Sequence, residues 1–210
     1  MSNPIVKLSE LFVKFPGIGP RQARRFVYYL LHHDRKTAEE LIEAIQELKA
    51  STLQCSGCFR FFTKKNYNQF GALCEICSDE TADHSTLIIV EKDADLENVR
   101  KAGSYNGLYF VLGGLVPILD KNPEARIRII ALKKRIENLI KNGQLKELIL
   151  ALSASVEGDN TADYVHAELR DLATKNNLTI STLGRGLSTG TELEYSDPDT
   201  IREALRSRRS

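Results

Sequence analysis

The sequence predicts a multidomain α/β protein, and three features of the chain point to it. A helical pattern of apolar residues fills residues 1–53, and four cysteines follow within residues 54–80. Short apolar strands then alternate with helices through residues 81–183, which predicts a mostly parallel sheet with flanking helices. Residues 184–210 are expected to add a C-terminal strand and helix. A chain of 210 residues is long enough for two to three small domains with cores.

The bulk composition is that of an ordinary globular protein. Hydrophobic residues make up 42% and charged residues 27%, and the net charge is +1. Bulk charge therefore indicates neither a nucleic-acid partner nor a membrane, and any DNA binding must rest on local features. No apolar run approaches the roughly 20 residues that span a bilayer, and residues 1–10 lack a signal-peptide pattern. We expect a cytoplasmic protein without membrane association.

Two helices joined by a glycine hairpin open the chain. Apolar residues at helical spacing predict helices over about residues 5–15 and 20–34, with Pro16-Gly17-Ile18-Gly19-Pro20 between them. Gly17 and Gly19 can take backbone angles closed to other residues, and Pro20 suits the first position of a helix. Free N–H groups at this helix start are suited to hold a phosphate.

The helix after the hairpin carries a basic edge. On an ideal helix, Arg21 and Arg25 lie opposite the apolar stripe and Arg24 lies at its flank. Arginines there would bind phosphates rather than base edges, so DNA binding should tolerate any sequence. The alternative is a glycine-rich turn with arginines that are merely solvated. The pattern resembles the helix-hairpin-helix motif of DNA-binding proteins.

A third helix is predicted from Thr37, because Thr37 and Glu40 form a capping box. Its apolar residues are expected to face inward, and they are Leu41, Ile42, Ile45 and Leu48.

The four cysteines form two Cys-x-x-Cys pairs, Cys55 with Cys58 and Cys74 with Cys77. Two such pairs supply four thiolates for one Zn²⁺, and four protein ligands leave no open position, so the zinc should be structural. Four free buried cysteines are the alternative. The 15 residues between the pairs, 59–73, mix basic and aromatic side chains that either stack on bases or, as we favour, pack a small core.

Strands and helices alternate from Thr86. Strands are expected at residues 87–90, 108–112, 148–152 and 178–183, and helices at residues 94–102, 124–142 and 161–176. Functional loops of such a sheet lie at the carboxyl ends of its strands.

Those strand ends resemble a Toprim domain, the module of topoisomerases and primases. Its catalytic members hold Mg²⁺ with a glutamate, which Glu91 matches, and with an Asp-x-Asp pair, which falls on Ser153 and Ser155. Serines cannot supply the charge of a Mg²⁺ site, so we expect a catalytically silent domain and no enzyme. Glu91, Asp95 and Glu157 would then serve partners or remain as vestiges, and a residual metal site of Glu91, Asp93 and Glu157 is the weaker alternative.

The tail alternates apolar and polar residues over 191–197, as an exposed strand does, and Ser196 or Asp197 can cap a last, arginine-rich helix.

The complete order resembles the RecR family of recombination mediators. Matching segments include residues 15–25, 74–79, 107–114, 156–162 and 190–195. The resemblance implies a bacterial, nucleoid-associated repair protein that forms tetrameric rings, binds single- and double-stranded DNA, and acts with RecO and RecF to load RecA. It places the DNA-contacting basic pair on Arg21 and Arg25, and it links the tail, with Leu193, Glu194, Tyr195 and Asp197, to a Walker B-like assembly segment.

The chain departs from this family in its longer spacing between the cysteine pairs and in Lys92-Asp93 after the Toprim glutamate. Two other classes of function remain open. One is a Mg²⁺-dependent Toprim nuclease or primase-like enzyme, and the other is a zinc-stabilised scaffold that binds proteins only.

Overall fold

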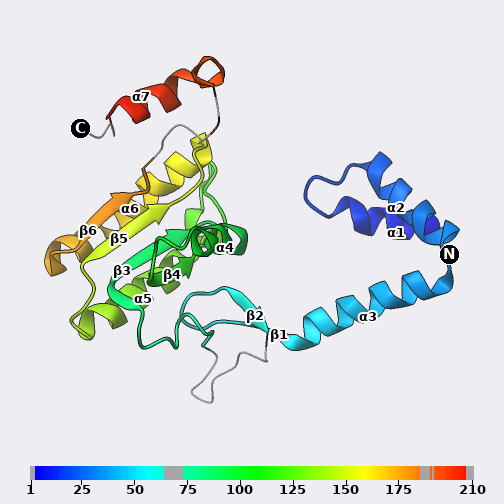
Figure 1. The fold of residues 1–210 in the computed structure, drawn as a ribbon, viewed down its shortest axis with the longest axis horizontal. Helices are drawn as coiled ribbons and strands as arrows, with labels where there is room; N and C mark the ends of the chain where they lie inside the picture. Colours follow the sequence, from blue (N-terminus) through cyan, green and yellow to red (C-terminus); the bar gives the residue numbers. More distant parts are fainter. Residues whose placement is uncertain (1–2, 64–72, 185–189, 191, 207–210) are drawn as a thin grey trace. The chain divides into compact units, whose positions relative to one another are not determined.

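A computed structural model describes residues 3–63, 73–184, 190 and 192–206 (Figure 1). The chain divides into two compact units, Met1–Thr52 and Leu53–Ser210, called here the N-terminal and C-terminal units. Among the described residues, no helix is both long enough and apolar enough to cross a membrane.

Three helices form the N-terminal unit: α1 Pro4–Val13, α2 Pro20–His32 and α3 Arg35–Ser51. Helices α1 and α2 pack together through the Phe12 and Phe26 rings, whose centroids are 5.6 Å apart, with Ala23 and Val27 buried. The two helices flanking the hairpin therefore lie close to their predicted places.

Helix α3 differs from its prediction in two ways. Its N-cap is Asp34, whose carboxylate accepts the Thr37 N–H at 3.0 Å and the Thr37 hydroxyl at 2.8 Å, so Thr37 is inside the helix. The predicted capping box was wrong because an aspartate three residues earlier competes for the same N–H. The helix buries no residue, and the four apolar side chains expected to face inward are 41% to 61% exposed.

The C-terminal unit is built on a four-stranded parallel sheet of order β4-β3-β5-β6. Its strands are β3 Asp83–Val90, β4 Gly107–Val111, β5 Glu147–Ala151 and β6 Thr179–Thr182. Its helices are α4 Asp93–Ala102, α5 Ile129–Lys141, α6 Val156–Asn176 and α7 Pro198–Arg206, with short 3₁₀ turns at Pro123–Ala125 and Leu193–Tyr195. A two-stranded sheet of β1 Thr52–Gln54 and β2 Phe61–Thr63 precedes it.

Both faces of the central strand β3 are buried. Leu87 and Ile89 belong to a core shared with α5 and α6, whereas Ile88 and Val90 belong to a second core. The second core contains Leu96 of α4 together with Cys55, Cys58 and Cys74. Burial on both faces explains why these strands read as continuous apolar runs.

Helix α5 begins at Ile129, not at the predicted residue 124. The Arg128 N–H donates to Leu112 O at 2.9 Å, and the Arg128 guanidinium donates to Val111 O at 2.9 Å. Residues just before α5 are therefore held by the end of β4 and cannot form helical hydrogen bonds. Helix α6 begins five residues earlier than predicted, at Val156, because the Ser155 hydroxyl caps it by accepting the Gly158 N–H at 3.1 Å.

The tail contradicts its prediction as well. Leu193–Tyr195 is a 3₁₀ turn where an exposed strand was expected. A strand is stable only when its backbone pairs with a neighbour, and the described sheets offer no strand beside this segment. Helix α7 follows, and Asp197 caps it by accepting the Thr200 N–H at 2.9 Å.

Gly158 is the glycine on which the start of α6 depends. A Cβ at this position would lie 1.9 Å from Ser153 O, whereas a Cβ at Gly184 would meet nothing within 4 Å. We expect Gly158→Ala to destabilise the C-terminal unit by about 1–3 kcal/mol or more, measured by urea denaturation. Gly184→Ala is the matched control, and equal stability of the two variants would contradict the close approach of α6 to β5.

Candidate nucleic-acid interface and metal centre

The glycine hairpin presents an open helix start. Gly17 has φ of +77°, a left-handed value that strains any residue with a side chain. Gly19 is the N-cap of α2 and offers no side-chain cap, and Pro20 is the first helical residue. Ile18 N donates to Phe15 O at 3.1 Å and closes the hairpin. The first-turn N–H groups therefore lack a capping side chain and remain available to an anion.

Arg21, Arg24 and Arg25 are all exposed on the first turns of α2. Arg25 donates to Gln22 Oε1 at a long 3.4 Å, which leaves most of its guanidinium available. Arg24 also lines a groove between α1 and α2. Three cationic side chains thus stand beside an uncapped helix start, an arrangement suited to phosphate oxygens.

The four cysteines converge as predicted. The Sγ atoms of Cys55, Cys58, Cys74 and Cys77 lie within 4.8 Å of one another, and this group could hold a metal ion. The N–H groups of Gly57 and Cys74 donate to Cys55 Sγ at 3.4 and 3.3 Å, and hydrogen bonds from the other three cysteines hold the pKa of Cys55 far below its usual range. Four sulfurs at this spacing fit a tetrahedral ion closed to further ligands.

The residues just after Cys58 join the cysteine cluster to the sheet. Cys58 O accepts the Val111 N–H of β4 at 2.8 Å, and the Phe59 ring packs on Phe110 with centroids 5.3 Å apart. The Arg128 guanidinium lies over the other side of Phe59, 5.5 Å from the centroid. The described part of the inserted loop therefore packs into the core instead of presenting rings for base stacking; Lys64, Lys65, Tyr67 and Phe70 lie outside the described residues.

Arg60 forms a buried ionic link that the sequence did not signal. Its guanidinium donates to Glu75 at 2.7 Å and to Glu97 of α4 at 2.8 Å. Burial lowers the pKa of Arg60, but the adjacent carboxylates, Glu75 first, outweigh it and keep that pKa above its usual value. Nothing in the sequence distinguishes Arg60 from a solvated arginine, since both of its partners come from other segments.

The acidic residues after β3 have structural partners. Asp93 accepts the Phe61 N–H at 2.7 Å, and Asp95 accepts the Lys92 N–H at 3.1 Å as part of the cap of α4. Glu91 is largely buried beside Lys92, and Glu157 is exposed at the start of α6. Across the described ranges, the cysteines are the group of three or more ligating residues close enough to hold a metal; Glu91, Asp93 and Glu157 form none.

Ser153 and Ser155 occupy the place of the Asp-x-Asp pair. Their hydroxyls lie 3.1 Å apart, and Ser155 is committed to capping α6. In the tail, Leu193 is 61% and Tyr195 76% exposed, and Glu194 and Asp197 are exposed as well.

Removal of the metal should weaken the whole C-terminal unit, because three of the cysteines share a core with β3 and β4. We expect chelation to lower its thermal midpoint by more than about 10 °C, since structural metal sites contribute many kcal/mol. Circular dichroism melts with and without a chelator, followed by metal re-addition, measure this. An unchanged midpoint after stoichiometric metal loss would show that the cysteine core is self-sufficient.

Comparison with known proteins agrees with this geometry. A family described as "RecR, helix-hairpin-helix" matches residues 5–49, and one described as "Toprim domain" matches residues 85–183. The recombination protein RecR of Herpetosiphon aurantiacus is 35% identical over 99% of this chain and 94% of its own length. That of Chloroflexus aggregans is 35% identical over 100% and 95%, and that of Ureaplasma parvum 31% over 100% and 98%. The helical unit with its hairpin, the cysteine cluster and the parallel sheet together place this chain in the RecR family of recombination proteins.

Proposed function

We propose that this chain is a DNA-binding recombination mediator that acts in recombinational DNA repair without catalysing a reaction. The observation that carries the proposal is the exposure of Arg21, Arg24 and Arg25 beside the uncapped start of α2. Phosphate binding by such a site is independent of sequence and suits both single- and double-stranded DNA.

The partners in this proposal are RecO and RecF, with which the chain helps to load RecA onto single-stranded DNA in the bacterial cytoplasm. Its support is family membership and the name "Recombination protein RecR" carried by the relatives. Glu91, Asp95 and Glu157 are assigned to a partner-facing or vestigial Toprim edge, and Glu157 is the most exposed of the three.

A homotetrameric clamp completes the proposal. One hairpin on a protein of net charge +1 binds DNA weakly, and repetition in an oligomer multiplies it through effective concentration. The exposed apolar face of α3 supports self-association, since an uncovered stripe of this kind marks a protein interface. The exposed tail residues Leu193, Glu194, Tyr195 and Asp197 form a second assembly segment in this proposal.

The metal proposed for the cysteine cluster is one structural Zn²⁺, because zinc is the usual ion of a closed four-thiolate site. The alternative of a Mg²⁺-dependent Toprim enzyme gains no support from the strand ends, where serines replace the aspartates and Asp93 and Asp95 bind backbone N–H groups.

Removal of the basic pair tests DNA binding. We expect Arg21→Ala with Arg25→Ala to abolish DNA retention in a gel-shift assay, and any residual binding to lose about 0.9 in log–log salt slope per lost duplex phosphate contact. Zinc content and helicity should not change, because both side chains are exposed.

Arg170→Ala with Lys175→Ala, two exposed cations on α6, is the matched control for loss of charge. Unchanged retention by the Arg21 and Arg25 variant would sink the proposed interface. No retention by the unaltered protein even at low salt would favour a protein-only scaffold.

Charge placed on the apolar face of α3 tests assembly. We expect Ile42→Glu with Ile45→Glu to lower the solution mass by at least half, because burying these carboxylates in an interface is unfavourable. Light scattering measures the mass, and Glu43→Lys with Glu47→Lys, exposed changes on the same helix, is the control. A mass insensitive to the isoleucine changes would remove α3 from the interface.

A further inference from the structure

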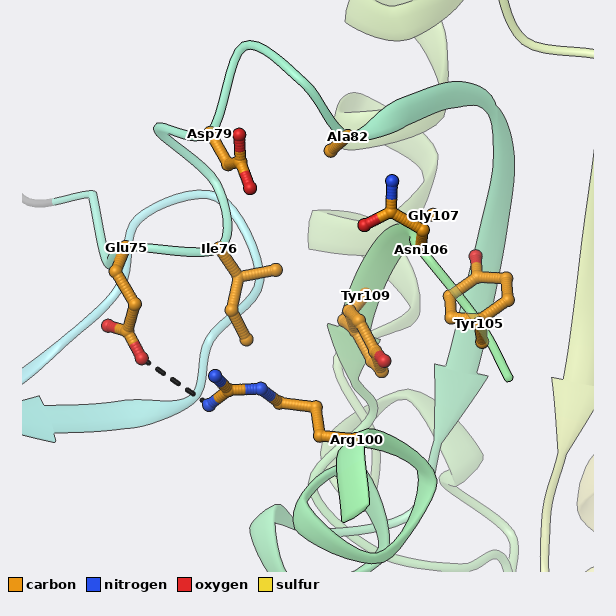
Figure 2. A pocket seen from close by; sticks show the side chains of 9 residues that line it. All are labelled: Glu75, Ile76, Asp79, Ala82, Arg100, Tyr105, Asn106, Gly107 and Tyr109. Carbon is orange, nitrogen blue, oxygen red and sulfur yellow. Dashed lines mark hydrogen bonds and ion pairs between the residues drawn. The ribbon is translucent and has the colours of Figure 1, made fainter. Parts of the chain in front are cut away.

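A cavity of about 190 Å³ lies between the second cysteine pair and the edge of the sheet. Figure 2 shows Glu75, Ile76 and Asp79 on one side of it and Asn106, Tyr105 and Tyr109 on the other, with Arg100 below. Both sides belong to the C-terminal unit, so the cavity is part of one compact body. Neither the DNA interface nor the cysteine cluster uses it.

The walls offer oxygen acceptors that lack donors. Asp79 binds the Thr81 N–H and hydroxyl through Oδ1 alone, at 2.8 and 2.7 Å. The Asn106 side-chain amide donates to Thr81 O at 3.3 Å, which turns its oxygen toward the cavity (Figure 2). Among the described residues, Glu75 Oε2 is buried without a hydrogen-bond partner. A buried acceptor left unpaired is costly, so this region is poor in donors.

The cations near the cavity are already committed. Arg60 and Arg100 both contact Glu75 and Glu97, so two guanidinium groups balance two carboxylates. The described ion pairs leave the exposed Asp79 carboxylate outside this quartet. The cavity therefore has one excess negative charge at its mouth.

The apolar part of the lining suits the stem of a long side chain. Ile76 and the methylenes of Arg100 lie beside the Tyr109 ring, and Tyr109 is only 3% exposed (Figure 2). Long basic side chains bury such stems while their charged ends meet polar groups, and a cation also gains from an aromatic ring.

We propose that this cavity binds the guanidinium or ammonium group of an arginine or lysine side chain from a protein partner. Such a group has three to five N–H donors and no acceptor, which matches the donor-poor, acceptor-rich walls. An anion would meet Asp79 and Glu75. A metal ion would need three close ligating residues, a requirement that in the described part of the chain the four cysteines meet. This site is separate from the DNA interface and goes beyond the function proposed above.

Capped arginine, N-acetyl-arginine amide, is the probe, and capped citrulline is its control with the same shape and no charge. We expect the full-length protein to bind capped arginine in the millimolar range by titration calorimetry, and Asp79→Asn to weaken binding about tenfold. Asparagine can still accept from Thr81, so the local turn is kept. Tyr109→Phe, which removes only the hydroxyl, is a second conservative variant.

Glu80→Gln removes the neighbouring charge, which does not line the cavity, and should leave binding unchanged. Equal binding of citrulline, or equal binding by Asp79→Asn, would overturn the proposal. Spermidine binding as tightly as capped arginine, with the same dependence on Asp79, would overturn the assignment to a protein partner in favour of a free polyamine. The Arg21→Ala, Arg25→Ala variant should retain arginine binding, so failure of one site is distinguishable from failure of the other.

Discussion

The hydrogen bond from Val111 N–H to Cys58 O, at 2.8 Å, joins the cysteine cluster to the sheet, and much of the C-terminal unit depends on that junction. Around it, Phe59 packs on Phe110, Arg60 reaches Glu97 of α4, and Phe61 N–H binds Asp93. A four-thiolate metal site holds its own loops rigidly. Because the first of these loops also contacts β4 and α4, that rigidity extends to the sheet edge, and the metal is part of the core of the unit.

The same contacts give a physical reason for a silent Toprim edge. A Mg²⁺ site requires carboxylates free to turn toward one ion. Here Asp93 and Asp95 are occupied with backbone N–H groups, and the serine at the second position of the Asp-x-Asp pattern caps α6. Residues in the positions that support chemistry in catalytic members instead stabilise helix starts and the loop of the cysteine cluster. The fold is retained with its strand ends used for structure.

The N-terminal unit has the opposite character, since it buries little and exposes much. Helices α1 and α2 share a small contact around Phe12, Phe26, Ala23 and Val27, while α3 buries none of its side chains. A unit of this size gains limited stability from so small a core. Cover for α3 from another chain would stabilise the unit and bring several hairpins together, so folding and DNA affinity would both depend on assembly.

Local chemistry in the sequence determined much of the protein. Paired cysteines predicted the metal site, glycines and Pro20 predicted the hairpin, and apolar runs predicted the parallel sheet, because each signal lies within a few neighbouring residues. Tertiary structure alone decided the rest. Asp34 takes the cap from Thr37, Arg128 ties residues before α5 to β4, and Arg60 finds carboxylates 15 and 37 positions away. It also left the apolar face of α3 uncovered and the tail without a strand partner. Such outcomes depend on which distant groups compete for a hydrogen bond, a charge or a surface, and sequence spacing does not record that competition.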